Sequence, residues 1–366
     1  MKNIFSKEIS PRKWCFFTIT VSAVIIFGAA LLVYIVDPHY RYRRPFLYKM
    51  AYYELYATAP HILKNESYDC LMLGSSMTRN FFINDIDSTF GCKSVKLSAS
   101  GATTADLRKF FDIASESKGD SLRCVILSLD IYSLNKTDNH YSEFQYLYRD
   151  DLKEEYRYLF SRQTFSSMLY LIKCKTRPRR ERKYINDRNR MFATDYEGKP
   201  YGWNAVMEDV FLNERIHNTQ TPYNPEAHKE SLYEMLLPMF DNHPQIKFIV
   251  YLPPYHIYTY CQSELFHEAE DLIRQRSIVM GELVKRKNVT LYDFQADPKY
   301  VENFDFYSDI EHFNNTAAKE ILKDLKSGNR KISSSEDIRK NEQKLRALIK
   351  KNMPVYHSHK EQFKRR

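Results

Sequence analysis

Short apolar runs separated by helical patterns fill the middle of the chain. The runs have the length of buried strands, and the segments between them repeat apolar residues at helical spacing. The predicted strands are residues 69–73, 93–98, 123–130, 246–252 and 289–294, and the predicted helices are residues 103–116, 225–240, 262–286 and 315–327. This alternation predicts an α/β fold with three α/β/α layers around a central, mostly parallel, five-stranded sheet.

The longest uncharged run lies near the N-terminus, at residues 14–36. Its 23 positions are enough for a helix to cross the hydrocarbon core of a bilayer. Trp14 and Tyr34 lie near its two ends, where aromatic rings prefer the membrane interface. The run is too long for a signal-peptide core and continues through Gly28 and its small neighbours, so we expect an uncleaved signal anchor. Four basic residues flank it on each side, which leaves its orientation open.

The remaining segments predict the domain organisation. Residues 37–66 form a Tyr- and Arg-rich connector, and residues 67–328 form the α/β domain. An insertion at about 133–222 leaves the sheet near the third strand, and such an insertion either shapes a binding cleft or forms a solvated lobe. Within it, residues 173–190 hold nine Lys/Arg and two acidic residues. A basic tail, residues 329–366, is predicted to be helical from a capping-box pattern at Ser333 to about Lys351 and disordered at its end.

The charge distribution argues against a nucleic-acid partner. The formal net charge is +9, but residues 329–366 contribute +8 and residues 1–13 contribute +3, which leaves −2 for the rest of the chain. Basic ends beside a membrane helix suit anionic headgroups, and solvated tails are the alternative.

The sequence predicts no metal and no cofactor. The six cysteines are scattered without a C-x-x-C pair or zinc-ligand spacing, and there is no Walker A or dinucleotide-binding glycine motif. Whether any of the cysteines form a disulfide stays open.

Two polar motifs are the candidates for chemistry. Ser75 and Ser76 follow Gly74 at the end of the first predicted strand, where a tight turn lifts a hydroxyl above the sheet. Asp309 and His312 stand between the last strand and the last helix of the domain. An aspartate that orients a histidine, which in turn takes a proton from a serine, is the arrangement of an activated nucleophile. The alternative is that Gly-Ser-Ser is an ordinary loop, Asp309 caps a turn and His312 is a half-buried surface residue.

These motifs resemble three blocks of the SGNH (GDSL-type) hydrolase superfamily, which has a flavodoxin-like sheet. The blocks are Gly74-Ser75-Ser76-Met77, Gly101 and Asp309-x-x-His312, over roughly residues 67–327. The resemblance implies that Ser76 is the nucleophile, His312 the base and Asp309 its partner, with the amides of Ser76 and Gly101 as oxyanion donors.

The layout of one helix followed by a catalytic domain is similar to the membrane-anchored branch of that superfamily, which acts in alginate O-acetylation and lipoteichoic-acid D-alanylation. This likeness implies a cytoplasmic basic N-terminus (residues 1–13), an extracytoplasmic domain and a surface polysaccharide or related acylated polymer as substrate. A multi-pass membrane acyltransferase is the implied protein partner.

The third block departs from the family pattern. Its usual Asn, an oxyanion donor, is replaced by Asp130 or Ser128. An ionised Asp130 cannot donate a hydrogen bond and would oppose a developing oxyanion. Either Asp130 has another task, such as orienting a loop, or Arg79 or Asn80 replaces the missing donor.

The literal letters Gly-Asp-Ser-Leu occur at residues 119–122, before the third strand. Ser121 would therefore lie at the amino edge of the sheet, far from His312, and we reject it as the nucleophile.

Three hypotheses follow. The chain is a serine acyltransferase or esterase acting on O-acyl groups, a non-catalytic binding partner with the same cleft, or a membrane scaffold in which both motifs are incidental. Asp130 and the basic insertion favour the second hypothesis.

Overall fold

The chain divides into two units. The computed structural model describes residues 10–135, 138–176, 186–192, 199–216 and 224–365. Residues 1–50 and 144–180 make up the first unit, and residues 51–143 and 181–366 make up the second. Residues 1–9 of the predicted basic N-terminus and residues 177–185 of the basic stretch lie outside the described residues.

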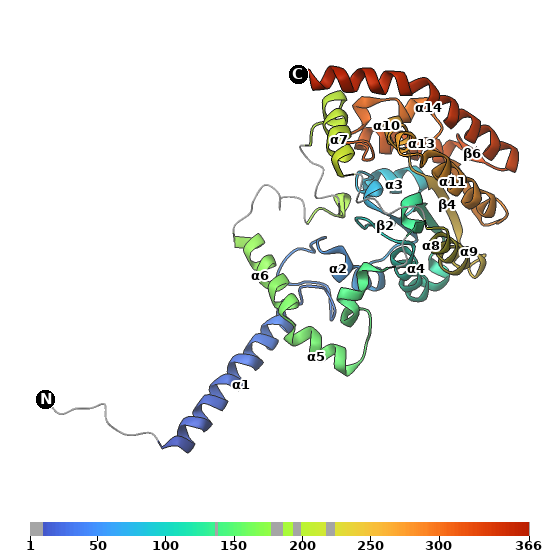
Figure 1. Cartoon of the computed structure of the whole chain (residues 1–366). Helices are drawn as coiled ribbons and strands as arrows, with labels where there is room; N and C mark the ends of the chain where they lie inside the picture. Colours follow the sequence, from blue (N-terminus) through green and yellow to red (C-terminus); the bar gives the residue numbers. More distant parts are fainter. Residues whose placement is uncertain (1–9, 136–137, 177–185, 193–198, 217–223, 366) are drawn as a thin grey trace. The chain divides into compact units, whose positions relative to one another are not determined.

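The second unit is built on a six-stranded sheet (Figure 1). Its strands are β1 (Cys70–Gly74), β2 (Ser94–Ser98), β3 (Cys124–Ser128), β4 (Lys247–Leu252), β5 (Val289–Asp293) and β6 (Lys331–Ile332). They run in the order β2-β1-β3-β4-β5-β6, and only β6 is antiparallel to its neighbour. The α/β class and the five parallel strands are confirmed. The predicted count of five is wrong, because β6 has two residues and is too short to leave an apolar pattern.

Helices of the second unit connect and cover these strands. They are α2 (Leu55–Asn65), α3 (Ile83–Phe90), α4 (Thr104–Lys118), α7 (Trp203–Ile216), α8 (Pro225–Glu230), α9 (Leu237–Asp241), α10 (Ile257–Leu265), α11 (Ala269–Leu283), α12 (Pro298–Val301), α13 (Asn315–Ser327) and α14 (Ser335–Lys364). Short 3-10 turns are η1 (Ser76–Thr78), η2 (Gly119–Ser121), η3 (Ile131–Asn135), η6 (Arg188–Arg190) and η9 (Phe304–Phe306), while His140–Leu147 (η4) crosses the boundary between the units and Ser231–Leu236 (η8) is a π-helical turn.

Both faces of the sheet are covered by helices. Successive side chains of a strand point to opposite faces, so neighbouring positions identify what lies on each side. Phe248 of β4 contacts Phe111 of α4 and Phe240 of α9. Tyr292 of β5, which the register places on the opposite face, donates a hydrogen bond to the carbonyl of Leu325 in α13. Helix α3 packs against α13. The two faces therefore bury separate sets of strand side chains.

Two predicted helices differ from the observed ones. The segment 262–286 is not one helix, because His267 adopts a left-handed φ of 62° and separates α10 from α11. The tail helix is capped at Ser334, whose side chain accepts from the Asp337 amide, one residue later than the predicted box. It continues well beyond Lys351 because it buries Tyr356 and other apolar residues and packs against α10 and α11.

Among its described residues, the first unit contains the helices α1 (Pro11–Val36), α5 (Leu152–Phe160) and α6 (Arg162–Thr176). Helix α1 has 26 residues and is long and apolar enough to span a membrane. Helices α5 and α6 pack against α1 and against each other. The middle of the predicted insertion thus belongs with the N-terminal segment in one compact unit.

Gly74 ends β1 for a different reason from the predicted one. Its φ is not left-handed, so it does not serve a sharp turn. A Cβ at this position would instead lie 2.8 Å from the Cβ of Ser128 in β3 and would clash with the methyl group of Thr78. Glycine therefore allows β3 and the turn after β1 to approach each other closely.

We expect Gly74→Ala to destabilise the protein, because the added methyl group overpacks this contact and such changes cost about 1–3 kcal/mol. Gly281→Ala is the matched control, since a Cβ there meets nothing within 4 Å and Gly281 lies inside α11. It should be neutral or stabilising by roughly 0.5–1 kcal/mol. Denaturant unfolding of the two variants in detergent measures both effects, and equal stability of Gly74→Ala and the parent would contradict the steric argument.

Candidate active site

Ser76 opens a 3-10 turn directly after β1, at the carboxyl edge of the sheet. Ser75 caps this turn, and its hydroxyl oxygen accepts a hydrogen bond from the Met77 amide at 3.3 Å. Because the chain order places β2 and β3 on opposite sides of β1, this edge is the topological switch point of the sheet. Open α/β sheets bind their ligands at such a point.

Asp309 and His312 lie in a short loop whose ends are joined by an antiparallel bridge between Tyr307 and Phe313. The Asp309 carboxylate accepts hydrogen bonds from the backbone amides of Glu311 at 2.9 Å and His312 at 2.6 Å. It also lies 2.9 Å and 3.0 Å from Nδ1 of His312. The loop therefore fixes the orientation of the imidazole from one side.

The structure brings the three predicted residues together. Oγ of Ser76 lies 2.7 Å from Nε2 of His312. With the Nδ1 proton directed at Asp309, the lone pair of Nε2 is available to accept the Ser76 hydroxyl proton. The side chain of His312 is 20 % exposed and that of Asp309 is 19 % exposed, so the pair is accessible but largely dry. This geometry matches a nucleophile, a base and an orienting carboxylate.

The charges within this group support one another. Burial raises the pKa of Asp309, but the hydrogen bond and charge of His312, together with the two backbone amides, bring it below its ordinary value. Burial lowers the pKa of His312, but the hydrogen bond and charge of Asp309 and the charge of Glu311 raise it above its ordinary value. The site therefore stabilises a protonated His312, as a general base requires once it has taken the proton.

Asp130 follows β3 and faces the turn that carries Ser76. Its carboxylate accepts hydrogen bonds from the Tyr255 hydroxyl, from the Ser75 hydroxyl at 3.3 Å and from the Tyr132 amide at 3.1 Å. Burial raises its pKa, and these hydrogen bonds act in the opposite direction. Three acceptor bonds fit a group that orients the Ser75 turn, which is the first of the two explanations offered for its departure from the family pattern.

The predicted amide donors lie at the same edge. Gly101 follows β2 and has a left-handed φ of 61°, a conformation that glycine adopts without strain. Within the described residues, neither the Ser76 amide nor the Gly101 amide donates a hydrogen bond to another protein group. Their role as oxyanion donors stays a prediction.

Asn80 has a hydrogen-bond partner in the loop of His312, which engages one of the two protons of its side-chain amide. Its role as a replacement oxyanion donor stays a prediction. The side-chain nitrogen of Asn80 donates to the backbone carbonyl of Phe313 at 2.6 Å. The side-chain nitrogen of Asn315 donates to the backbone carbonyl of Asn80 at 2.8 Å. These two bonds, which we call the asparagine clasp, connect the segment after Ser76 with the segment after His312. They hold the two halves of the site together.

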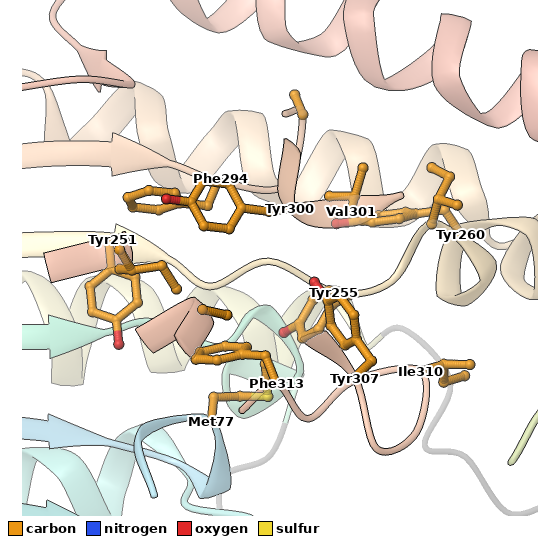
Figure 2. Packing of buried hydrophobic residues seen from close by; sticks show 14 of the residues in the cluster. Met77, Tyr251, Tyr255, Tyr260, Phe294, Tyr300, Val301, Tyr307, Ile310 and Phe313 are labelled. Carbon is orange, nitrogen blue, oxygen red and sulfur yellow. The ribbon is translucent and has the colours of Figure 1, made fainter. Parts of the chain in front are cut away.

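Buried apolar side chains reinforce the clasp. Met77 follows Ser76 and Phe313 follows His312, and both belong to one buried cluster with Tyr307 and Ile310 (Figure 2). Each residue of the site is thus next to a side chain that anchors its loop in the core.

Lys96 of β2 supports the same segment and was missed from the sequence. It is fully buried and donates to the carbonyls of Arg79 at 2.8 Å and Phe81 at 2.7 Å. Burial and the charge of Arg79 lower its pKa to about 7. A lysine in the middle of a predicted buried strand was the available signal, because such residues are rare without partners.

Two further carboxyl groups belong to the surroundings of His312. Asp209 of α7, in the inserted segment, accepts from the Ile310 amide at 3.0 Å. Burial raises the pKa of Glu311 to about 7; the charge of His312 lowers it, and the charges of the three neighbouring aspartates raise it further. Asp209 was not predicted, because its distance from Asp309 in the sequence gives no signal.

Ser121 lies in η2, before β3, and donates to the Lys118 carbonyl at 2.6 Å. It is at the amino edge of the sheet, as expected. Among the described residues, no group of three or more His, Cys, Asp or Glu side chains is arranged to hold a metal ion.

Comparison of the chain with protein-family models, with curated proteins and with solved structures gave no match.

We expect Asn80→Ala and Asn315→Ala to slow the reaction of Ser76 with a fluorophosphonate, a serine-directed reagent. Loss of the clasp frees the two loops to separate, and a displacement of about 1 Å costs up to about 10²-fold in rate. Asn288→Ala is the control, because its amide also donates to main-chain carbonyls, those of Phe240 and His243, but before β5. Rates are to be compared with melting temperatures. If the labelling rate fell in proportion to the melting temperature in all three variants, including the control, a positioning role of the clasp would be contradicted.

Proposed function

We propose that the chain is a membrane-anchored serine acyltransferase or esterase that acts on O-acyl groups of a cell-surface polysaccharide or related polymer. The observation that carries this proposal is the 2.7 Å contact between Oγ of Ser76 and Nε2 of His312, backed by Asp309.

In the first step, Oγ of Ser76 attacks the acyl carbonyl carbon while its proton moves to Nε2 of His312. Asp309 stabilises the resulting imidazolium, and the backbone amides of Ser76 and Gly101 are the proposed donors to the developing oxyanion. The carbon–oxygen bond to the leaving group then breaks, and His312 returns the proton to the leaving oxygen. The product is an acyl ester on Ser76.

In the second step, an acceptor hydroxyl loses its proton to His312 and attacks the acyl ester. The ester bond to Ser76 breaks, and Oγ regains a proton from His312. A sugar hydroxyl as the acceptor gives acyl transfer, and water gives hydrolysis. The balance between them depends on how well the site excludes water.

The strand order β2-β1-β3-β4-β5 supports the flavodoxin-like, three-layer architecture that the resemblance to SGNH hydrolases implies. Helix α1 supports a single-pass anchor at the cell membrane. The extracytoplasmic side for the second unit is proposed on the resemblance to the membrane-anchored branch of the SGNH hydrolases. A multi-pass acyltransferase is the protein partner proposed on the same resemblance, as a source of acyl groups at the membrane.

Asp130 supports a second candidate, a catalytically inactive binding partner in polymer modification. Its carboxylate stands where the family pattern has an amide donor, and loss of one such donor costs about 10²–10³ in rate. In this alternative the same cleft binds the polymer or the acyltransferase without forming an acyl ester.

Covalent labelling by a fluorophosphonate distinguishes the two candidates. We expect the parent to be labelled at Ser76, and Ser76→Ala to remain unlabelled, because only a serine activated by a base reacts readily. Ser121→Ala is the control and should retain labelling at Ser76, because Ser121 lies in η2 at the amino edge of the sheet. Persistent labelling of Ser76→Ala would identify another nucleophile, and an unlabelled parent would favour the binding partner.

The pH dependence of that labelling tests the electrostatics. Only neutral His312 accepts a proton, so labelling should rise with pH through a pKa above the ordinary value of histidine. The Glu311 charge contributes to this elevation, so Glu311→Gln should move the rise to lower pH. Glu282→Gln removes a surface charge paired with Lys285 and should leave the profile unchanged. A shift to higher pH for Glu311→Gln would contradict the assignment.

A further inference from the structure

Exposed apolar side chains are concentrated in the first unit. Among the described residues, 25 large apolar side chains are exposed, and 20 of them lie in residues 1–50 and 144–180. Fourteen belong to α1 and the residues just after it, where a bilayer is the proposed environment. The other six lie on α5 and α6, outside the apolar run predicted from the sequence. They call for a separate explanation, since a soluble surface rarely collects so many.

The exposed residues of α5 form a stripe. Leu152, Tyr156 and Phe160 are spaced at i, i+4 and i+8, and they are 89 %, 65 % and 36 % exposed. The buried residues of the helix, Glu154 and Tyr158, lie on a different face. The apolar stripe of α5 is therefore not the side with which the helix packs into its own unit.

Helix α6 repeats the arrangement. Phe165, Leu169 and Ile172, at i, i+4 and i+7, are 38 %, 41 % and 44 % exposed. Met168 and Leu171 are buried. Two consecutive helices thus pack into their unit with one face and carry an apolar stripe on another, exposed face.

Polar contacts fix α5 at the carboxyl end of α1. Asp37 ends α1 in a left-handed conformation, and its carboxylate accepts a hydrogen bond from the Tyr158 hydroxyl at 2.7 Å. Arg41 pairs with Glu155 at 2.9 Å, and the Tyr42 hydroxyl donates to the same carboxylate at 2.7 Å. Helix α5 therefore lies at the level where the apolar run of α1 ends.

That level has the features of a membrane interface. Tyr34 is near the end of α1, and the guanidinium of Arg43 lies over its ring at 4.7 Å and over that of Phe46 at 5.4 Å. Phe46 and Leu47 are themselves exposed. Aromatic rings and arginines that extend toward headgroups are typical of this depth.

We propose that α5 and α6 are interfacial helices that lie in the headgroup region of the bilayer crossed by α1. Their outward stripes face the acyl-chain boundary, and exposed Lys153, Arg157 and Lys173 remain among the lipid phosphates. The inference rests on the proposed membrane anchor and is independent of the acyl-transfer chemistry. The occupant of the stripes is lipid, because the polar cluster at Asp37 ties them to the end of a helix that enters lipid.

Tryptophan quenching in vesicles tests this proposal with the full chain. The native tryptophans, Trp14 and Trp203, are replaced by phenylalanine, and one tryptophan is introduced at Tyr156 or Leu169 on the stripes. Two controls carry it at Arg157, on the polar side of α5, or at Tyr233, exposed in the second unit. The vesicles contain phosphatidylglycerol and brominated phosphatidylcholine.

We expect Tyr156→Trp and Leu169→Trp to lose most of their emission, Arg157→Trp to lose less and Tyr233→Trp to lose none. A protein that keeps Trp14 and lacks Trp203 reports separately on the anchor. Quenching of Trp14 without quenching at 156 and 169 overturns the interfacial helices while keeping the anchor. If that quenching pattern is found together with a dimeric mass in detergent, the stripes instead bind a second copy of the chain. Failure to quench Trp14 overturns both.

Discussion

The hydrogen bond between Ser76 and His312 joins residues 236 positions apart, so it exists only while two loops are held over the same edge of the sheet. Three kinds of contact hold them. Met77 and Phe313 are buried in one apolar cluster, the asparagine clasp links the two backbones, and Lys96 binds the carbonyls after the turn. Burying a lysine costs free energy unless it is hydrogen-bonded, and the two carbonyl contacts of Lys96 offset part of that cost.

The parts of the fold that long sequence patterns control were predictable. The five predicted strands match the five parallel strands, because burial on both faces favours apolar residues along a strand. Strand β2 departs from this pattern, since it also buries Ser94, Lys96 and Ser98. The predictions fail where a single residue or a tertiary contact determines where a helix or strand begins or ends. His267 breaks a helix that propensity would continue, and α14 continues past Lys351 because it packs on α10 and α11. Strand β6 exists only through its pairing with β5.

The residues of the site that could be predicted are those that belong to short, recognisable sequence motifs. Ser76 follows a strand, and Asp309 precedes His312 by three residues, so each half could be recognised alone. The groups that hold the halves together had no such pattern. Asn80 in a turn and Asn315 at the start of α13 match no motif until their partners are known. Asp209 reaches the His312 loop from the inserted segment. Spatial neighbours distant in sequence leave no periodicity to detect.

Acyl transfer creates a positive charge on His312 and a negative charge on an oxygen of the substrate. The charged groups of the site stabilise the first and oppose the second. Asp130, Asp209, Asp309 and Glu311 all act on one another or on His312, so the surroundings favour the imidazolium. The same carboxylates oppose an oxyanion on the substrate. Burial raises the pKa values of Asp130, Asp209 and Glu311, which favours their neutral, protonated forms and reduces this negative charge. An enzyme built this way depends on its backbone amides for the oxyanion and on tight substrate positioning for its rate, which favours a narrow substrate range over a general esterase.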